Sequence, residues 1–388
     1  MEIEICKWYD DADSPILFMV DDLANVWVDT NGNGQVDLEE DWGYAKNNEN
    51  SSFRFLISVI LKDKQEVKIT FFTPVGIRVG MIENPKIKSI SKMLNCDEES
   101  KEFFRSINDS SRFEIAYHGT THGRVGKTNL DFIQEWELYN SLEEAVNKIN
   151  YGREIYKEVF GEYPKGGKYC GYEINEFSDE SIDNTGFLWW CRYWNRGKTN
   201  ENPLTNFDIK TFGKNNVYDI PSTIDGSFLN GILHPNKHKL LKKLLRDLLI
   251  RLKLHQLDFL LKNKLVISIQ EHMAPSRDDG RRQSPNIFDD KESLNYIFEY
   301  LKSKRVWYCT GSELVEYVHT RQNINIIILD QDSFKIDILN KVNGLLSIKL
   351  PNDVNFIKSP NGIIVKKNDG CFNVEIMRGK YLIIRGNR

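Results

Sequence analysis

The sequence predicts a mixed α/β fold followed by a small all-β region. Short apolar segments alternate with helical segments through the first two-thirds of the 388 residues. Alternation of this kind predicts a parallel sheet or an α/β barrel. After about residue 322 the helical periodicity fades, and β-branched runs are separated by turn signals. We therefore expect two domains, an α/β domain over 1–322 and a small β-sandwich-like domain over 323–388.

Six short segments have the composition of strands that are buried on both faces of a sheet, because they are apolar and often β-branched or aromatic. They span 16–20, 67–72, 113–117, 187–191, 265–270 and 306–309. Helical patterns lie between several of them, over 51–62, 130–159, 237–262 and 291–302. Ser141 and Glu144 form a capping-box pattern, which is typical of a helix start.

The C-terminal region has the pattern of antiparallel strands. Turn signals occur at 359–362, 368–370 and 377–379. Residues 372–376 alternate between apolar and polar side chains, as expected of a strand with one buried face. A small appended β-domain follows from this pattern.

Composition excludes some functional classes. The net charge of −4 and the pI near 6.1 do not favour a nucleic-acid partner. No apolar run approaches the roughly 18 residues of a membrane span, and no signal-peptide pattern is present, so we expect a cytoplasmic protein without a transmembrane segment. The basic stretch over 237–264 also has amphipathic spacing. It fits the solvated face of a packed helix better than a membrane-binding surface.

Three of the predicted strands end in acidic or imidazole side chains. The first strand runs into Asp21 and Asp22, the third into His118 and His122, and the fifth into His272. In parallel sheets and barrels, chemistry gathers at the carboxyl ends of the strands. This shared position predicts one site that contains all five residues.

The spacing of His118 and His122 suits a metal site. If a helix begins there, two imidazoles four residues apart share one face and can chelate a single ion. A second pair at this spacing, His234 and His238, follows no strand and leads into the basic stretch. We interpret that second pair as accidental.

The motifs resemble the polysaccharide deacetylase (NodB-homology) family over about residues 14–320. The resemblance lies in Asp21-Asp22 after a strand, in Ile69-Thr-Phe-Phe72 followed by Pro74-Val-Gly76, in His118-Gly-Thr-Thr-His122, and in a late strand that ends at His272. It implies a distorted (β/α) barrel. It also implies hydrolysis of N- or O-acyl groups on sugars.

The resemblance implies a role for each of the five residues. Asp21 matches the general base and His272 the general acid. Asp22, His118 and His122 match the metal ligands, for zinc or another first-row divalent ion. Two imidazoles and one carboxylate leave coordination positions open for water and for the carbonyl oxygen of the substrate, which fits this chemistry. A backbone N–H near Tyr169 is expected to hold the oxyanion.

The sequence departs from the family pattern in one motif. Lys168 and Cys170 stand where the family has Arg and Pro, and Lys cannot make the bidentate contact of Arg with a carboxylate. We expect Lys168 and Tyr169 to orient the base or the substrate. Trp190 and Trp42 are candidate substrate contacts, with burial in the core as the alternative for each.

Residues 29–40 match the calcium-binding loop of an EF-hand. The oxygen-bearing residues fall at the required positions, and Gly34 stands at the sharp turn. The flanking helices of an EF-hand are not predicted, because a strand precedes the loop. We therefore weigh calcium at the rim of the site against a polar loop that needs no ion. The candidate ligands are Asp29, Asn31, Asn33, Gln35, Asp37 and Glu40.

The first functional hypothesis is a metal-dependent hydrolase that removes an acetyl or formyl group from an amino sugar. Its substrate would be a nucleotide-linked or lipid-linked precursor or an oligosaccharide. The alternative is a non-catalytic carbohydrate-binding or scaffold protein on a retired deacetylase barrel, which Lys168 and Cys170 favour. A metal-dependent enzyme of another reaction type is a third hypothesis, since a fold does not dictate a function.

Overall fold

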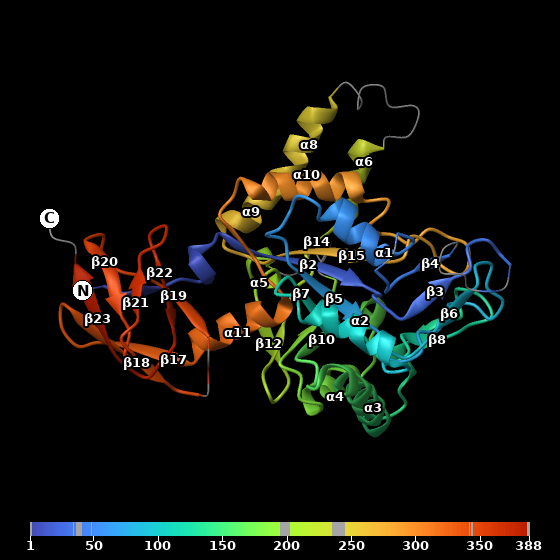
Figure 1. Ribbon diagram of the computed structural model, residues 1–388, viewed down its shortest axis with the longest axis horizontal. Helices are drawn as coiled ribbons and strands as arrows, with labels where there is room; N and C mark the ends of the chain where they lie inside the picture. Colours follow the sequence, from blue (N-terminus) through green and yellow to red (C-terminus); the bar gives the residue numbers. More distant parts are fainter. Residues whose placement is uncertain are drawn as a thin grey trace.

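The α/β part of the molecule is organised around one curled, mostly parallel sheet (Figure 1). A computed structural model describes residues 2–33, 35, 41–47, 49–194, 202–234, 245–340, 342 and 344–385. The strand order is β12 (Lys210–Phe212), β13 (Val217–Asp219), β11 (Trp189–Cys191), β10 (Gly166–Lys168), β7 (Phe113–Tyr117), β5 (Ile69–Thr73), β2 (Ser14–Asp21), β15 (Ile267–His272) and β14 (Ile224–Asp225). Strand β16 (Val306–Tyr308) also pairs with β2. The mixed α/β architecture predicted from the sequence is confirmed.

The two edges of this sheet are brought together by one stretch of chain. Strand β13 pairs in parallel with β11, and β14, which begins five residues after β13 ends, pairs in parallel with β15 at the other edge. Between β13 and β14, the backbone amide of Ile220 also donates a hydrogen bond to the carbonyl of Trp190 in β11. The sheet is therefore curled into a half-barrel.

Side chains of the central strand alternate between two cores. Ile16, Phe18 and Val20 belong to the larger cluster, which includes buried side chains of the surrounding helices, whereas Leu17 and Met19 belong to a second cluster with residues of neighbouring strands. This alternation is the two-residue period of a strand. Because Asp21 continues the series of Leu17 and Met19, the period directs its carboxylate to the second cluster's side, at the carboxyl end of the strand.

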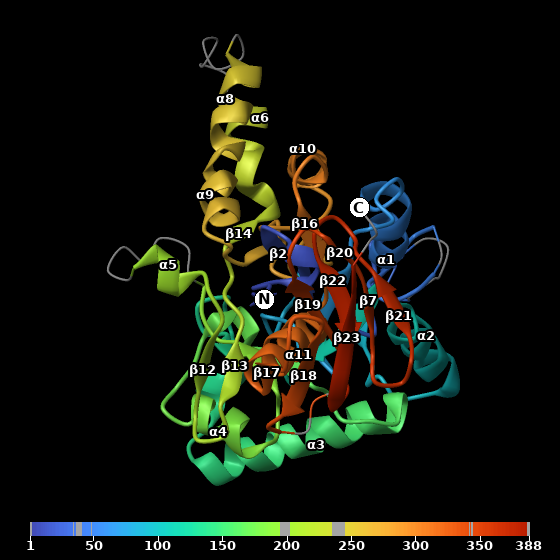
Figure 2. The same ribbon diagram turned by 90° about the vertical axis from the view of Figure 1, so that its left-hand side faces the viewer.

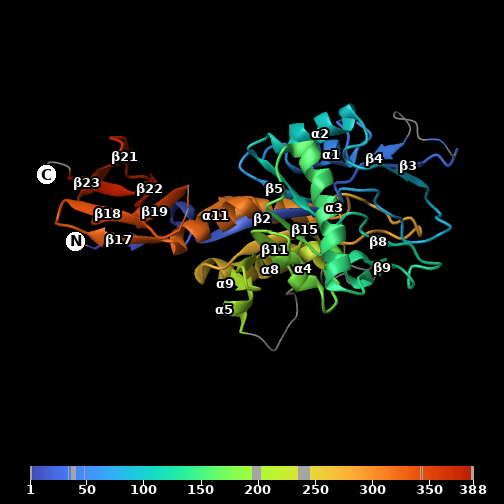
Figure 3. The same cartoon turned by 90° about the horizontal axis from the view of Figure 1, so that it is seen from below.

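The helices cover the outside of the sheet and connect its strands (Figures 1 and 3). The predicted helix over 130–159 is wrong in its first part, because the helix begins only at Leu142, where the Ser141 hydroxyl accepts the amide of Glu144. Residues 237–244 of the predicted basic helix lie outside the described residues. The helices are α1 (Ser52–Phe55), a π-helical turn η2 (Leu56–Ile60), α2 (Glu98–Asn108), α3 (Leu142–Phe160), α4 (Ser178–Asn184), α5 (Pro203–Asn206), α6 (Asn230–Leu233), α8 (Arg246–Leu254), α9 (Gln256–Lys262), α10 (Lys291–Lys302) and α11 (Gly311–Gln322).

Short elements lie between these. The 3₁₀ turns are η1 (Tyr9–Asp11), η3 (Glu135–Leu138), η4 (Cys170–Tyr172) and η5 (Gly226–Leu229). Strands β3 (Val26–Val28), β4 (Trp42–Gly43) and β6 (Ser89–Ser91) form a small sheet beyond the end of β2, and β8 (Gly123–Arg124) pairs with β9 (Ile133–Gln134). Helices α6, α8 and α9 project from the body, as Figure 2 shows most clearly.

The C-terminal strands form two antiparallel sheets that share one apolar core. The larger has the order β17 (Ile324–Ile328), β18 (Ser333–Ile338), β23 (Gly379–Arg385), β20 (Val354–Lys358) and β21 (Ile364–Lys366). The smaller has the order β1 (Glu4–Ile5), β19 (Leu345–Lys349) and β22 (Phe372–Glu375). The first strand of the chain thus pairs within the C-terminal region. The division of the chain at 322/323 stays a prediction.

Every helix among the described residues is too short or too polar to cross a lipid bilayer.

Candidate active site at the carboxyl ends of the barrel strands

A cavity of about 680 Å³ opens where β2, β7 and β15 end. Its wall contains both polar groups from these strand ends and aromatic rings from the small sheet and the loops around it. The five residues predicted to form one site all line it. The lining includes Asp21, Asp22, Trp42, Tyr44, Arg78, His118, His122, Phe132, Gly171, His272 and Phe288.

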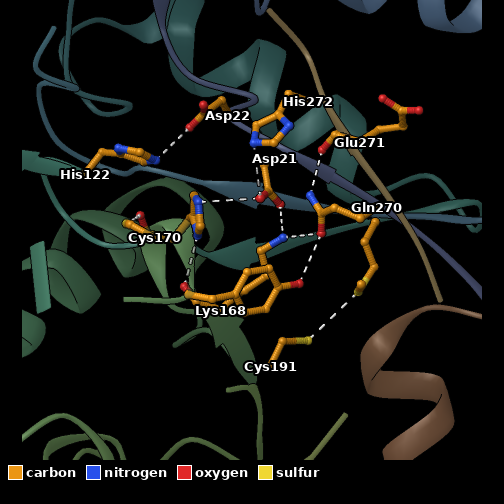
Figure 4. A network of polar contacts seen from close by, with 12 residues as sticks. Asp21, Asp22, His122, Lys168, Cys170, Cys191, Gln270, Glu271 and His272 are labelled. Carbon is orange, nitrogen blue, oxygen red and sulfur yellow. Dashed lines mark hydrogen bonds and ion pairs between the residues drawn. The ribbon is translucent and has the colours of Figure 1, made fainter. Parts of the chain in front are cut away.

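Asp21 lies at the centre of the site, paired with a buried lysine (Figure 4). The Nζ of Lys168 is 2.5 Å from Oδ1 of Asp21 and also donates to the side-chain oxygen of Gln270. Lys168 is fully buried. Burial alone would raise the pKa of Asp21, but the charge and hydrogen bond of Lys168 contribute to lowering it below its usual value. Asp21 is therefore held as a carboxylate.

Two imidazoles face the other oxygen of Asp21. The Nε2 atoms of His118 and His272 are each 3.9 Å from Oδ2 of Asp21. The Nδ1 of His118 is 2.9 Å from the carbonyl oxygen of Lys168, and the Nδ1 of His272 is 2.9 Å from that of Pro285. A carbonyl only accepts, so these contacts place a proton on each Nδ1 and leave each Nε2 facing the site.

Asp22 is engaged by an arginine that the sequence did not point to. The Nε of Arg78 is 3.2 Å from Oδ1 of Asp22, and its Nη2 is 2.9 Å from Oδ2. Burial raises the pKa of Asp22, but the charge and hydrogen bonds of Arg78, together with smaller contributions, lower it well below the usual range. His122 Nε2 lies 3.3 Å from Oδ1 of the same carboxylate.

His118 and His122 are brought together by a loop. The helix that would place them on one face does not form, because β7 ends at Tyr117 and the chain turns through positive φ at Gly119 (80°) and His122 (72°). The two imidazole ring centroids are 5.2 Å apart. Burial lowers the pKa of His118, and it lowers the pKa of His122 to about 3, so both rings are neutral.

A buried glutamate shapes this loop. The carboxylate of Glu135 accepts the backbone N–H groups of Thr120, Thr121 and His122 at 2.7 to 2.9 Å, and it also accepts the hydroxyl of Tyr139. Glu135 thus fixes the backbone of the loop that carries His122. Nothing in the local sequence indicates this contact, because it joins the loop to a separate 3₁₀ turn.

Cys170 is a third residue, after Arg78 and Glu135, that sequence reasoning did not include in the site. Ligand atoms of His118, His122 and Cys170 all lie within 4.8 Å of one another. Cys170 follows β10 in the motif where the family has Pro. Its thiol is fully buried and donates to the carbonyl of His118 over 3.2 Å. The signal that could have found it was the departure from the family pattern.

The aromatic predictions divide into two groups. Trp42 lines the cavity and packs edge-on against Phe288. The hypothesis that Trp190 stacks on a sugar is wrong, because its indole is fully buried among core rings. Tyr169 is also fully buried, and its backbone N–H faces the carbonyl of Cys191. Gly171 of the same loop does line the cavity.

The calcium hypothesis falls only in part on the described residues, because Asp37 and Glu40 lie outside them. In the described part, the side-chain oxygens of Asp29, Asn31 and Asn33 accept the amides of Gly32, Asn33 and Gln35, respectively. These oxygens thus have local backbone partners. Calcium binding stays a prediction.

Neither a protein-family model nor a curated protein matches this sequence. Solved structures do resemble it. A candidate polysaccharide deacetylase from Mycobacterium smegmatis is 14% identical over 82% of this chain and 94% of its own, with a TM-score of 0.45. A family 4 acetyl xylan esterase from Clostridium thermocellum, solved with a cobalt ion, is 13% identical over 77% of this chain and 89% of its own, with a TM-score of 0.35.

A CE4 family pseudoenzyme from Bacillus anthracis is 12% identical over 79% of this chain and 66% of its own, with a TM-score of 0.37. Polysaccharide deacetylases are thus among the structural neighbours of this chain, as the motifs suggest.

Proposed function

We propose that this protein is a metal-dependent hydrolase that removes an acetyl or formyl group from the nitrogen of an amino sugar. The observation that carries the proposal is the convergence of Asp21, His272 and the His118/His122 pair on one cavity. Metal-assisted amide hydrolysis needs a base, an acid and metal ligands. The carboxylate held by a buried lysine can be the base, the imidazole of His272 the acid, and the pair of neutral imidazoles two of the metal ligands.

The side chains fit a first-row divalent ion. His118 and His122 are neutral and close together, and the contact of His118 with the carbonyl of Lys168 fixes the nitrogen that is free to bind. Nδ1 of His122 is buried without a hydrogen-bond partner among the described residues. Such nitrogen donors favour zinc or a neighbouring metal, and Asp22 is the third donor according to the motif. When bound, the ion would lower the pKa of a water molecule and polarise the amide carbonyl.

The protein's own residues would move the protons. Asp21, ionised and fixed by Lys168, is placed to accept a proton from the attacking water. His272, oriented by the carbonyl of Pro285, presents Nε2 to the site and can donate a proton to the departing amine. Gly171 lines the cavity, and we propose its backbone N–H as the group that holds the oxyanion, in place of that of Tyr169.

The cavity suits a sugar. Trp42, Phe132 and Phe288 supply apolar ring surface beside the polar groups, an arrangement typical of small-molecule sites. We propose a nucleotide-linked or lipid-linked sugar or an oligosaccharide as the substrate class. We further propose that 323–388 is a separate β-domain and that the protein is cytoplasmic.

One observation favours the non-catalytic alternative. Arg78 supplies a positive charge to Asp22, in the place where the family uses a metal ion. A retired barrel that binds sugar without hydrolysing it could retain this pair. Metal content separates the two hypotheses, because a retired site should bind no divalent ion.

The test is acetate and formate release from N-acylated nucleotide sugars and chito-oligosaccharides, with zinc or cobalt added. Wild-type protein should release acid, and Asp21→Asn should not. Asp258→Asn is the matched control, because Asp258 is a partly exposed carboxylate on α9 that pairs with Lys304. Release by Asp21→Asn at the wild-type rate, or no release from any substrate by metal-loaded protein, would contradict the proposal.

A further inference from the structure

We infer that the third protein ligand of the metal is the sulfur of Cys170, while Asp22 stays paired with Arg78 outside the coordination sphere. This inference rests on the proposed metal site. It assigns to Cys170 a role that the family motif, with a proline at this position, does not contain.

The spacing of the three side chains suits one ion. Bond lengths of about 2.0–2.1 Å to nitrogen and about 2.3 Å to sulfur place the ligand atoms of a tetrahedral ion roughly 3.3–3.6 Å apart. The ligand atoms of His118, His122 and Cys170 lie within 4.8 Å of one another. Metal binding would therefore have to draw these atoms closer together by side-chain rotation.

Asp22 is a weaker candidate because both of its oxygens face one guanidinium. The two contacts, at 3.2 and 2.9 Å, make a bidentate pair, which is the strongest arrangement of such ions. A divalent ion on the Asp22 carboxylate would lie next to the Arg78 charge and would be repelled by it. If Asp22 stays paired with Arg78, the ion lies farther from the Arg78 charge and is repelled less. The ion then needs a third ligand besides the two imidazoles.

The Cys170 sulfur is buried beside the loop that carries the two histidines. Its thiol donates a hydrogen bond to the carbonyl of His118 over 3.2 Å, which metal binding would replace. Gly119 lies directly beside it, since a Cβ on Gly119 would be 3.3 Å from the sulfur and only 2.6 Å from Glu135. On binding, the thiol proton would pass to solvent and a sulfur–metal bond would form. Three protein ligands would then leave one position open, as in catalytic zinc sites.

The choice of sulfur has a chemical consequence. A thiolate with two imidazoles is a softer ligand set than a carboxylate with two imidazoles, so it favours zinc and cobalt over manganese and magnesium. The inference therefore predicts both a spectroscopic signature and a metal preference.

The experiment is titration of metal-free full-length protein with cobalt, followed by absorption spectroscopy. Cobalt bound to a thiolate has an intense near-ultraviolet charge-transfer band, which cobalt bound only to nitrogen and oxygen lacks. Wild-type protein should show the band, Cys170→Ser should lose it, and Asp22→Asn should keep it. Cys191→Ser is the matched control, because Cys191 is another fully buried cysteine of the same barrel whose thiol faces Met19.

Cobalt affinity is the second measurement. We expect Cys170→Ser to bind cobalt at least about 10–100-fold more weakly, since even residues that only orient a ligand have effects of that size. Bound cobalt without the band in wild type, or a band that survives in Cys170→Ser, would overturn the inference and leave the metal site intact. If wild type binds no cobalt at all, the proposed metal-dependent function fails together with it.

Discussion

The rim of the barrel and the core between the C-terminal sheets differ in the kind of side chain that they bury. At the rim, charged side chains such as Asp21, Asp22 and Lys168 are buried, and each is matched by a partner of opposite charge. The core between the C-terminal sheets contains apolar and aromatic side chains, among them Phe334, Ile348 and Tyr381.

The two kinds of buried side chain contribute differently to the stability of the fold. Buried ion pairs give little net stability, because desolvation of the charges offsets their attraction. Apolar burial contributes about 25 cal/mol per Å² of area removed from water. Removing one partner of such a pair would still leave a buried charge uncompensated and cost stability. At rim residues outside these ion pairs, such as His272, a substitution should change chemistry more than stability, and substitutions in the C-terminal core should do the reverse.

The largest expected effect is on catalysis at the rim. His272→Gln cannot transfer a proton to the leaving amine, so kcat should fall by about 10²–10⁴-fold, the usual contribution of a general acid. The melting temperature should change little. His255→Gln is the control, because His255 is exposed and pairs with Asp258 on the outer helices. A fully active His272→Gln would remove His272 from the mechanism.

A core substitution in the C-terminal sheets should have the converse result. Phe334 is fully buried and stacks on Tyr381 with ring centroids 5.1 Å apart. Phe334→Ala should cost about 3–5 kcal/mol of unfolding free energy in this region. Denaturant unfolding measures the loss, and Ile327→Ala, at a 42% exposed position in the adjacent strand, should cost far less. If folded Phe334→Ala protein failed to bind metal, the substitution would affect the site as well as stability. That result would contradict the prediction that the C-terminal core acts on stability alone.

A smaller effect is expected for the residue that shapes the histidine loop. Glu135→Gln replaces one acceptor oxygen with an NH₂ group, which cannot accept the backbone amides of residues 120–122. His122 should be less well oriented, and cobalt affinity should fall by about 10–100-fold. Glu137→Gln, on the exposed side of the same 3₁₀ turn, should bind cobalt normally. Equal affinities in the two variants would leave Glu135 with a structural role only.

The smallest effect concerns a buried acid behind His272. Burial, with Asp290 and Asp225 nearby, raises the pKa of Glu271 well above its usual value of 4.5. A raised acid pKa means that the folded protein holds a proton that the unfolded chain releases, so stability falls as the pH rises above about 4.5. Glu271→Gln should flatten this fall in a series of melting curves, and each pKa unit is about 1.4 kcal/mol. Glu299→Gln, exposed on α10, should keep the wild-type slope.

Much of the fold followed from local pattern. The strand at residues 113–117 has the bounds that its composition predicted. Strand β10 was missed, because its sequence Gly-Gly-Lys contains no apolar side chain. Gly167 is required there by close packing, since a Cβ on it would be 2.3 Å from the ring of Trp190.

The site was predictable where its residues end strands and not elsewhere. Asp21, His118 and His272 follow apolar runs, so the geometry of a parallel sheet brings them together. Arg78 and Glu135 lie in loops and turns, and neither contact follows from a strand end: Arg78 is 56 residues from Asp22, and Glu135 is 13 residues from His122. Such contacts depend on the tertiary path of the loops. The same limit explains why the sequence left Trp190 open between a substrate contact and a core residue, since a single sequence cannot tell a buried ring from an exposed one.

The pairing of β1 with β19 has a consequence for how the chain reaches its native state. Residues Glu4 and Ile5 must find partners at Ile348 and Lys349, at the opposite end of the polypeptide. During synthesis, ribosomes would release the first strand long before its neighbour exists. Contacts of such high sequence separation form late and slowly. The earliest segment to leave the ribosome is therefore expected to be among the last to become ordered.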